Sequence, residues 1–258
     1  MCDFLSTKNT HERDNHITFD EGPHIYTIDG DSNYMSVTKF NHNHFGHFNS
    51  DKIIDNMMNS DKWGQSKYYG MTKQEIKDLW NNNGKEASQA GTKMHEDIEY
   101  FYNNKPRENK SIEYQYFINF KDNFANLIPY RTEWMVWDKE LKLAGSIDML
   151  FENPDGTLEI YDWKRCKDIV KINSWNKFSH NKIIEHLPDT NFWHYSLQLN
   201  TYKYLLEKNY DKTINGMYLV CLHPNNKNKS YQRIKVADLS NEVKELMEER
   251  YNIINKNI

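Results

Sequence analysis

The chain has 258 residues, enough for one or two domains and for a full hydrophobic core. Aromatic residues make up 14 % of it, which argues against disorder, and the formal net charge of −4 excludes a protein that coats nucleic acid through bulk positive charge. No stretch approaches the roughly 18 consecutive apolar residues of a membrane span. The first residues also lack a charged segment followed by an apolar one, so we expect an intracellular protein without a signal peptide.

The cysteines argue against two kinds of stabilising site. Cys2, Cys166 and Cys221 are odd in number, far apart and free of any Cys-x-x-Cys spacing. A disulfide framework and a zinc or iron–sulfur site built on cysteine are therefore not expected. A reducing compartment is the simplest interpretation.

The first half of the chain reads as two short strands followed by helices. We expect strands at 17–19 and 24–28, joined through the turn residues of 20–23. Ser36 has the character of an N-cap for a helix near 37–40, and Thr72 with Glu75 has the spacing of a capping box. The further helices expected here cover 51–58, 72–80, 86–102 and 111–127.

The second half of the chain alternates strands and helices. Three short segments rich in β-formers lie at 132–137, 143–151 and 158–163, and Asn-Pro-Asp-Gly at 153–156 marks a hairpin turn between the last two. A helix at 192–207, strands at 216–222 and 231–236, and a helix at 239–254 complete the pattern. This order predicts an α/β fold, with residues 1–84 as a hairpin and helical extension packed on a core of residues 85–258.

The hairpin carries the residues that indicate chemistry. Side chains alternate along a strand, so Asp162 and Lys164 share one face. An odd-length loop centred on the turn would place Asp148 opposite Asp162 on that same face, whereas a two-residue loop would separate them, and we predict the odd loop. Two carboxylates and one ammonium would then converge, as in a site for a hard divalent cation. The alternative is a surface ladder of charges that merely supports the hairpin.

Three further features bear on this interpretation. His95 and Glu99 lie at i, i+4 on one helical face, where the histidine either completes a metal site or pairs with its own helix. Glu133 lies among tryptophans in the preceding strand, as an edge residue or as a carboxylate aimed at the site. Tyr195, Gln198 and Tyr202 share one helical face, which is equally the pattern of a core stripe.

At these positions the sequence resembles a known family, the RecB-like branch of the PD-(D/E)XK nuclease superfamily. Segments 36–38 and 91–99 are similar to the subgroup that includes mitochondrial genome maintenance exonucleases. The resemblance extends over about residues 24–205. It rests on Gly-x-x-Asp, Asp-x-Lys and Gln-x-x-x-Tyr motifs preceded by a helical histidine, which here are Gly145 and Asp148, Asp162 and Lys164, Gln198 and Tyr202, and His95.

The resemblance implies a restriction-endonuclease-like core, with a mixed central sheet flanked by helices, and a Mg²⁺- or Mn²⁺-dependent DNA nuclease. The expected activity is that of an exonuclease on single-stranded DNA or free DNA ends in replication, recombination or repair. By carry-over, the metal ligands are His95, Asp148, Asp162 and the backbone carbonyl of Trp163. Lys164 would be catalytic, Glu133 would support the site, and Gln198 and Tyr202 would position either the DNA or the protein groups next to the metal ligands. Some relatives carry an iron–sulfur cluster, but the cysteines here do not supply its ligands, so we expect none.

Basic residues after the hairpin are candidates for DNA contacts. Arg165 and Lys167 directly follow the Asp-x-Lys motif, and 223–235 contains basic residues and no acidic ones. Such groups can track phosphates or be ordinary solvated faces. The aromatic residues of the expected N-terminal helical segment would suit either base stacking or packing of that segment onto the sheet; they are Trp63, Tyr68, Tyr69 and Trp80. The histidine-rich stretch 42–47 lacks the partners of a metal site and is taken as a loop or helix end.

Other functions stay open at this stage. A structure-specific endonuclease would need the same residues. A nuclease-like module that binds DNA without cleavage requires the loss of a ligand or of the lysine, and the motif residues Asp148, Asp162 and Lys164 are all present. A hydrolase of small phosphoesters would be distinguished by single-nucleotide substrates.

Overall fold

The structure, a computed structural model, describes residues 4–256 and contains two compact units. One unit comprises the chain up to residue 46 together with the chain from residue 95 onward, and it holds every strand. The other comprises residues 47–94, with α3 (Ser50–Met58), the 3-10 turn η2 (Trp63–Gln65) and most of α4 (Lys73–Tyr102). No helix within the described residues is long and apolar enough to cross a membrane.

The predicted helices of the second half and the strands are confirmed with small shifts of their ends. They are β1 (Ile17–Asp20), β2 (Ile25–Ile28), β4 (Ile128–Asp138), β5 (Leu143–Glu152), β6 (Leu158–Lys164), α6 (Asn191–Asn209), β7 (Ile214–Cys221), β8 (Gln232–Lys235) and α7 (Ser240–Lys256). Ser36 does cap α2 (Val37–His42), because its Oγ accepts a hydrogen bond from the Lys39 amide at 3.2 Å. Helix α5 (Ile112–Asn123) ends four residues earlier than predicted. Five short elements were not predicted: η2 and, in addition, α1 (Phe4–Lys8), η1 (Glu12–His16), β3 (Met35–Ser36) and η3 (Lys182–Ile184).

The expectation of two separate helices at 72–80 and 86–102 is wrong, because α4 is one helix of 30 residues. Its start is as predicted: the Thr72 amide donates to Glu75 Oε2 at 2.7 Å, and the Glu75 amide donates to Thr72 Oγ1 at 3.3 Å. The expected break at 81–84 contains three asparagines and Gly84. Each of these weakens a helix by only about 0.5–1 kcal/mol relative to alanine, and none removes an amide as proline would. A helix already nucleated on both sides therefore continues through them.

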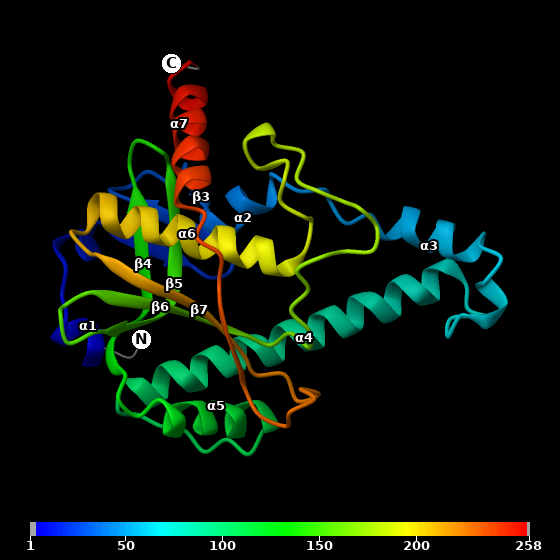
Figure 1. Ribbon diagram of the computed structural model, residues 1–258, viewed down its shortest axis with the longest axis horizontal. Helices are drawn as coiled ribbons and strands as arrows, with labels where there is room; N and C mark the ends of the chain where they lie inside the picture. Colours follow the sequence, from blue (N-terminus) through cyan, green and yellow to red (C-terminus); the bar gives the residue numbers. More distant parts are fainter. Residues whose placement is uncertain (1–3, 257–258) are drawn as a thin grey trace. The chain divides into compact units, whose positions relative to one another are not determined.

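The main sheet is mixed, and its topology leaves a gap beside β5. The strand order is β3-β5-β6-β7-β8, with β4 also pairing with β5 (Figure 1). Because β4 pairs antiparallel along the length of β5, β3 and β6 must share the opposite edge. There β3 pairs at Leu143–Ala144 and β6 pairs from Met149 onward. Residues 145–148 of β5 lie between the two partners.

Helices cover both faces of this sheet, and the alternation along β6 assigns its residues to them. Leu158 and Ile160 belong to a core cluster with Leu199 and Leu205 of α6. Trp163 instead packs against Phe120 of α5, with ring centroids 5.4 Å apart. Even-numbered residues of β6, including Asp162 and Lys164, therefore face the side of α6. The fold is the predicted α/β architecture with a mixed central sheet between helices.

Candidate active site

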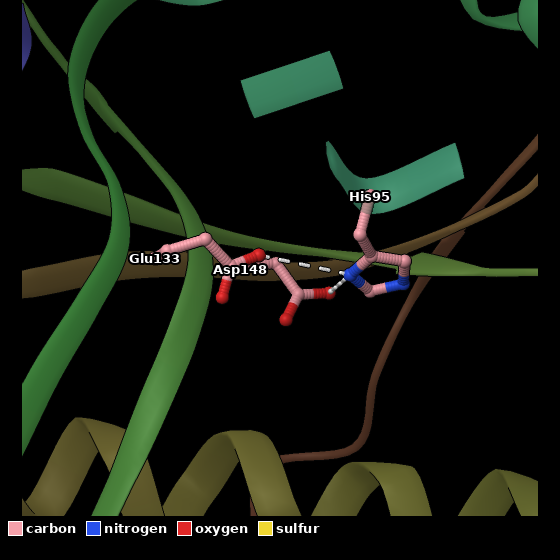
Figure 2. Close-up of side chains that lie close together, drawn as sticks. All are labelled: His95, Glu133 and Asp148. Carbon is pink, nitrogen blue, oxygen red and sulfur yellow. Dashed lines mark ion pairs between the residues drawn. The ribbon is translucent and has the colours of Figure 1, made fainter. Parts of the chain in front are cut away.

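Three side chains from three elements converge at the open edge of β5. His95 comes from α4, Glu133 from β4 and Asp148 from β5, and one ligand atom from each lies within 4.8 Å of the others. His95 Nδ1 is 3.5 Å from Asp148 Oδ2 and 3.8 Å from Glu133 Oε1, as Figure 2 shows. Within residues 4–256 this is the one group of three or more histidines, cysteines or carboxylates close enough to share a metal ion. The His95 side chain thus lies beside two carboxylates that come from other elements.

The hairpin has the odd-length loop that was predicted. The pairing of β5 with β6 runs from Glu152 opposite Leu158 to Met149 opposite Tyr161. The same register, continued by one residue, places Asp148 opposite Asp162. The two strands remain connected there, because the Trp163 amide donates a hydrogen bond to Asp148 Oδ2 at 2.9 Å.

Asp162 and Lys164 form a second charged pair on β6. Lys164 Nζ lies 2.6 Å from Asp162 Oδ2, and the Asp162 side chain is only 4 % exposed. Lys164 Nζ also lies 4.7 Å from the centre of the Tyr195 ring of α6. Asp162 does not belong to the close group of His95, Glu133 and Asp148. Of the predicted side-chain ligands, His95 and Asp148 thus lie together with Glu133, which was predicted only to support the site, whereas Asp162 is held by Lys164.

Glu133 reaches the site through an unusual backbone. Its φ angle is +43°, in the left-handed region that non-glycine residues rarely occupy. In the pairing of β4 with β5, its neighbours Thr132 and Trp134 lie opposite Met149 and Ile147, so Glu133 lies across from Asp148. Ser146 Oγ donates a hydrogen bond to Glu133 Oε2 at 2.9 Å and fixes the carboxylate. Backbone strain of this kind is characteristic of functional sites.

The charges of the cluster shift one another's proton affinities. Burial would lower the pKa of His95, but Asp148 and Glu133 outweigh it and raise that pKa to about 9. Burial raises the pKa of Asp148, and the nearby Glu133 adds to this against the opposing effect of His95. Burial also raises the pKa of Asp162 to about 6, although Lys164 opposes the change. The site therefore concentrates negative charge where solvation is poor.

Gly145 of β5 and Tyr202 of α6 form a close buried contact next to the carboxylates. A Cβ atom built on Gly145 would lie 2.8 Å from Tyr202 Oη and 2.9 Å from Tyr202 Cε1. Tyr202 is 4 % exposed and is hydrogen-bonded to Gln198 one turn earlier on α6. Gly145 is thus the residue that lets the tyrosine of the Gln-x-x-x-Tyr motif approach β5. The structure brings both motifs together, as a packed contact rather than an open surface.

Sequence reasoning missed Tyr26, which comes to the site from β2. Its side chain is 5 % exposed, hydrogen-bonds the backbone of Ser146, and interacts electrostatically with Glu133 and Asp148. Burial is the main reason that the pKa of Tyr26 rises to about 12. The only available signal was an alternating strand at 24–28, which gives no indication of the strand's partner. Tyr195 was seen as part of a helical stripe, but not as the ring beside Lys164.

The basic candidates after β6 have different environments. Arg165 Nε lies 2.6 Å from Glu113 Oε1 of α5, so its charge is partly neutralised, whereas Lys167 is exposed. Cys166 and Cys221 are free thiols with their Sγ atoms 3.8 Å apart, and Cys2 lies outside the described residues. In the later basic segment, Arg233 donates to Tyr161 Oη at 2.7 Å and is thus tied to the sheet.

Two other predicted regions are engaged in packing. In the unit of residues 47–94, Trp80 Nε1 donates to Tyr68 Oη at 2.9 Å, while Tyr69 remains 65 % exposed. Within the histidine-rich stretch, His44 is buried and contacts Asn181 through Nδ1 at 3.2 Å. The interpretation of that stretch as a helix end and loop agrees with the end of α2 at His42.

Comparison with known proteins identifies the family of this arrangement. No curated protein matches the chain. A solved structure entitled "Crystal structure of SSO0001" aligns over 98 % of this chain and 86 % of its own, at 11 % identity and a TM-score of 0.34, which is too weak a likeness to carry an inference. The sequence pattern of the PD-(D/E)XK nuclease superfamily matches residues 72–256, which include every residue of the candidate site except Tyr26. The chain belongs to the PD-(D/E)XK nuclease superfamily.

Proposed function

We propose that the chain is a divalent-metal-dependent deoxyribonuclease that acts as an exonuclease on single-stranded DNA or free DNA ends. The observation that carries this proposal is the convergence of His95, Glu133 and Asp148 beside the Asp162–Lys164 pair. Membership of a nuclease superfamily supports phosphodiester hydrolysis, and nucleases of this superfamily generally use divalent metals. DNA as the substrate, the need for an end, and Mg²⁺ or Mn²⁺ as the metal are the further steps of the proposal.

The donor set fits such a cation. Carboxylate oxygens are the ligands that Mg²⁺ and Mn²⁺ prefer, and Mn²⁺ also accepts imidazole. We expect His95, Glu133 and Asp148 to hold the ion, and Asp162 and the backbone carbonyl of Trp163 to be further ligands. A divalent ion bound there supplies Lewis-acid polarisation of the scissile phosphate and a lower pKa for an attacking water.

The neighbouring residues have roles that follow from their positions. Lys164 is held by Asp162 beside the acidic cluster, so its ammonium can offset the negative charge that develops on the phosphate in the transition state. Gln198 and Tyr202 of α6 would position either the DNA or the protein groups next to the metal ligands. Lys167 is exposed and free to contact a phosphate, while Arg165 would share its guanidinium with Glu113.

We further propose that the chain belongs to the RecB-like branch, with similarity to mitochondrial genome maintenance exonucleases, and that it acts in replication, recombination or repair. The motifs at 36–38 and 91–99 support this assignment. We also propose that residues 1–84 serve as an extension of a nuclease core at 85–258.

The test is cleavage of internally labelled DNA in four forms, single- or double-stranded and linear or covalently closed, with Mg²⁺, Mn²⁺ or EDTA. We expect linear single strands to be degraded with either metal, no cleavage in EDTA, and survival of the closed single-stranded circle. Degradation should decrease steeply with salt, because the phosphate contacts release counterions. Cleavage of the closed circle as fast as the linear strand would replace the exonuclease with an endonuclease.

Variants connect this activity to the site. Asp148→Ala, Asp162→Ala and Lys164→Ala should each reduce cleavage by at least about a hundredfold, because each removes a group that stabilises charge in the transition state. Glu140→Ala removes a carboxylate that is 62 % exposed and pairs with Lys208, and it should cleave like the wild type. DNA binding without cleavage by the wild-type protein under every metal condition would instead favour a binding module.

A further inference from the structure

The loop between β6 and α6 exposes large apolar side chains. Ile172 is 82 % exposed and Trp175 is 80 % exposed, the highest values among the large hydrophobic residues described. Val170 and Phe178 in the same loop are 42 % and 44 % exposed. Side chains of this size are normally buried, and their accumulation in one loop indicates a surface that contacts a partner.

The tip of this loop is held in place by hydrogen bonds. Asn173 Oδ1 accepts from the amides of Trp175 and Lys177 at 3.1 and 3.0 Å, and Asn173 Nδ2 donates to the Lys177 carbonyl at 2.8 Å. These bonds close residues 173–177 into a turn, with Asn176 in the left-handed region at a φ of +51°. Trp175 is therefore presented by a fixed turn.

The base of the loop is anchored as well. The Val170 amide donates to Asn191 Oδ1 at 2.8 Å, and Trp193 Nε1 donates to the Lys171 carbonyl at 3.0 Å. On the returning side, Ser179 Oγ donates to the His44 carbonyl at 2.7 Å. The loop leads directly from Lys164 at the end of β6 into α6, which carries Tyr195 (Figure 1). A ligand on this loop would thus be bound to the chain segment that connects two elements of the candidate site.

The charge of the loop indicates which kind of partner it would bind. Residues 169–184 contain Lys171, Lys177 and Lys182 and no acidic residue. Asp168 and Glu185 flank this range directly, and Lys182 pairs with Glu185. Lys171 and Lys177 make no ion pair with any described residue, and Lys171 Nζ lies 4.4 Å from the centre of the Phe192 ring. Aromatic rings interleaved with unpaired cations are the pattern by which proteins bind unpaired nucleic-acid strands, through base stacking and phosphate contacts.

We propose that residues 169–184 form a binding site for single-stranded DNA, in which Trp175 stacks on a base and Lys171 and Lys177 contact the adjoining phosphates. This inference rests on the proposed function, because it assumes that DNA is the substrate. It adds a site for the strand outside the metal cluster and the residues that follow it directly. It also gives a physical reason for a single-strand preference, since bases paired and stacked in a duplex offer no free face to Trp175.

The test measures the affinity for a fluorescein-labelled oligothymidylate by fluorescence anisotropy in EDTA, so that cleavage does not interfere. Trp175→Ala should weaken binding by at least about tenfold, and Trp175→Phe should retain part of the affinity because it keeps a ring. The double variant Lys171→Ala/Lys177→Ala should lower the slope of log affinity against log salt by roughly 1.4, because each phosphate contact on a single strand contributes about 0.7. Tyr251→Ala removes a ring of 45 % exposure from α7 and should bind like the wild type. Because the Trp175 side chain is 80 % exposed, circular dichroism and the melting temperature of its variants should match the wild type.

A second probe isolates stacking. An abasic oligonucleotide of the same length keeps the phosphates and loses the bases, so wild type and Trp175→Ala should bind it equally. The stacking site would be overturned if Trp175→Ala weakened binding equally for the normal and the abasic oligonucleotide, or weakened binding of neither. The nuclease proposal would remain intact in both cases if the wild type still cleaves DNA. Binding of vesicles of phosphatidylserine and phosphatidylcholine that depends on Trp175, with no binding of the oligothymidylate, would overturn it in favour of a membrane contact. Failure of the wild type both to bind and to cleave DNA would refute the proposed function itself.

Discussion

Replacement of Gly145 by alanine tests how the two halves of the candidate site fit together. The added Cβ would lie 2.8 Å from Tyr202 Oη, 2.9 Å from Cε1 and 3.2 Å from Cζ. All three distances are shorter than ordinary van der Waals contact, and Tyr202 is 4 % exposed within the core cluster on α6. Neither the strand nor the ring can move away freely. Overpacking of this kind typically costs about 1–3 kcal/mol of unfolding free energy, and we expect Gly145→Ala to lie in that range.

The assay is urea unfolding followed by circular dichroism, with Gly91→Ala as the matched control. A Cβ built on Gly91 meets nothing within 4 Å, and this glycine lies inside α4, so Gly91→Ala should stabilise the protein by about 0.5–1 kcal/mol. Tyr202→Phe removes the nearest clashing atom and should recover part of the loss when combined with Gly145→Ala. A Gly145→Ala protein within about 0.5 kcal/mol of the wild type would refute the close approach of Tyr202 to β5.

Three further predictions concern single groups. Glu133 has a φ of +43°, a backbone conformation whose strain only glycine relieves. Glu133→Gly should therefore be about 1 kcal/mol more stable than Glu133→Ala in urea unfolding, and both variants should lose cleavage. Equal stabilities of the two variants would argue against the strained backbone. Burial lowers the pKa of His44 to about 4, against the effect of Glu249 and with minor contributions from His180 and Arg250. The neutral His44 therefore contributes to the free energy of unfolding fully above pH 6.5, and up to about 3 kcal/mol is lost as the pH falls toward 4. His44→Asn should make the free energy of unfolding depend less steeply on pH in that interval. An unchanged dependence in this variant would contradict the prediction. Lys164→Ala should lose cleavage by at least about a hundredfold with nearly unchanged DNA affinity in EDTA, whereas loss of affinity alone would make Lys164 a binding residue.

The sequence allowed the hairpin of the site to be predicted because local rules govern it. A period of two along each strand and an odd loop at 153–157 are sufficient to place Asp148 opposite Asp162. The cap at Ser36 and the box at Thr72 and Glu75 are likewise local patterns, and the structure has both. The family motifs added His95, whose position relative to Asp148 no local rule supplies.

The features that sequence reasoning missed depend on contacts between distant residues. Tyr26 approaches Glu133 and Asp148 only because β2 packs near the start of β5. Arg165 is a cation in the sequence, yet its partner Glu113 lies 52 residues away on α5. The direction of the Glu133 side chain depends on a left-handed backbone conformation that no residue propensity indicates for glutamate. The helix break at 81–84 was wrong for the opposite reason, because weak local preferences were allowed to outweigh cooperativity.

The most direct test of the site is the binding of Mn²⁺, measured by electron paramagnetic resonance of the free ion, which requires no DNA and no activity. We predict saturable binding to the wild type that Asp148→Asn and His95→Ala each weaken by at least about tenfold, since loss of one of few protein ligands removes a substantial part of the binding energy. Glu140→Gln, which neutralises the exposed carboxylate paired with Lys208, should bind Mn²⁺ like the wild type. Equal Mn²⁺ affinity in the wild type, Asp148→Asn and His95→Ala would contradict the assignment of this cluster as the metal centre.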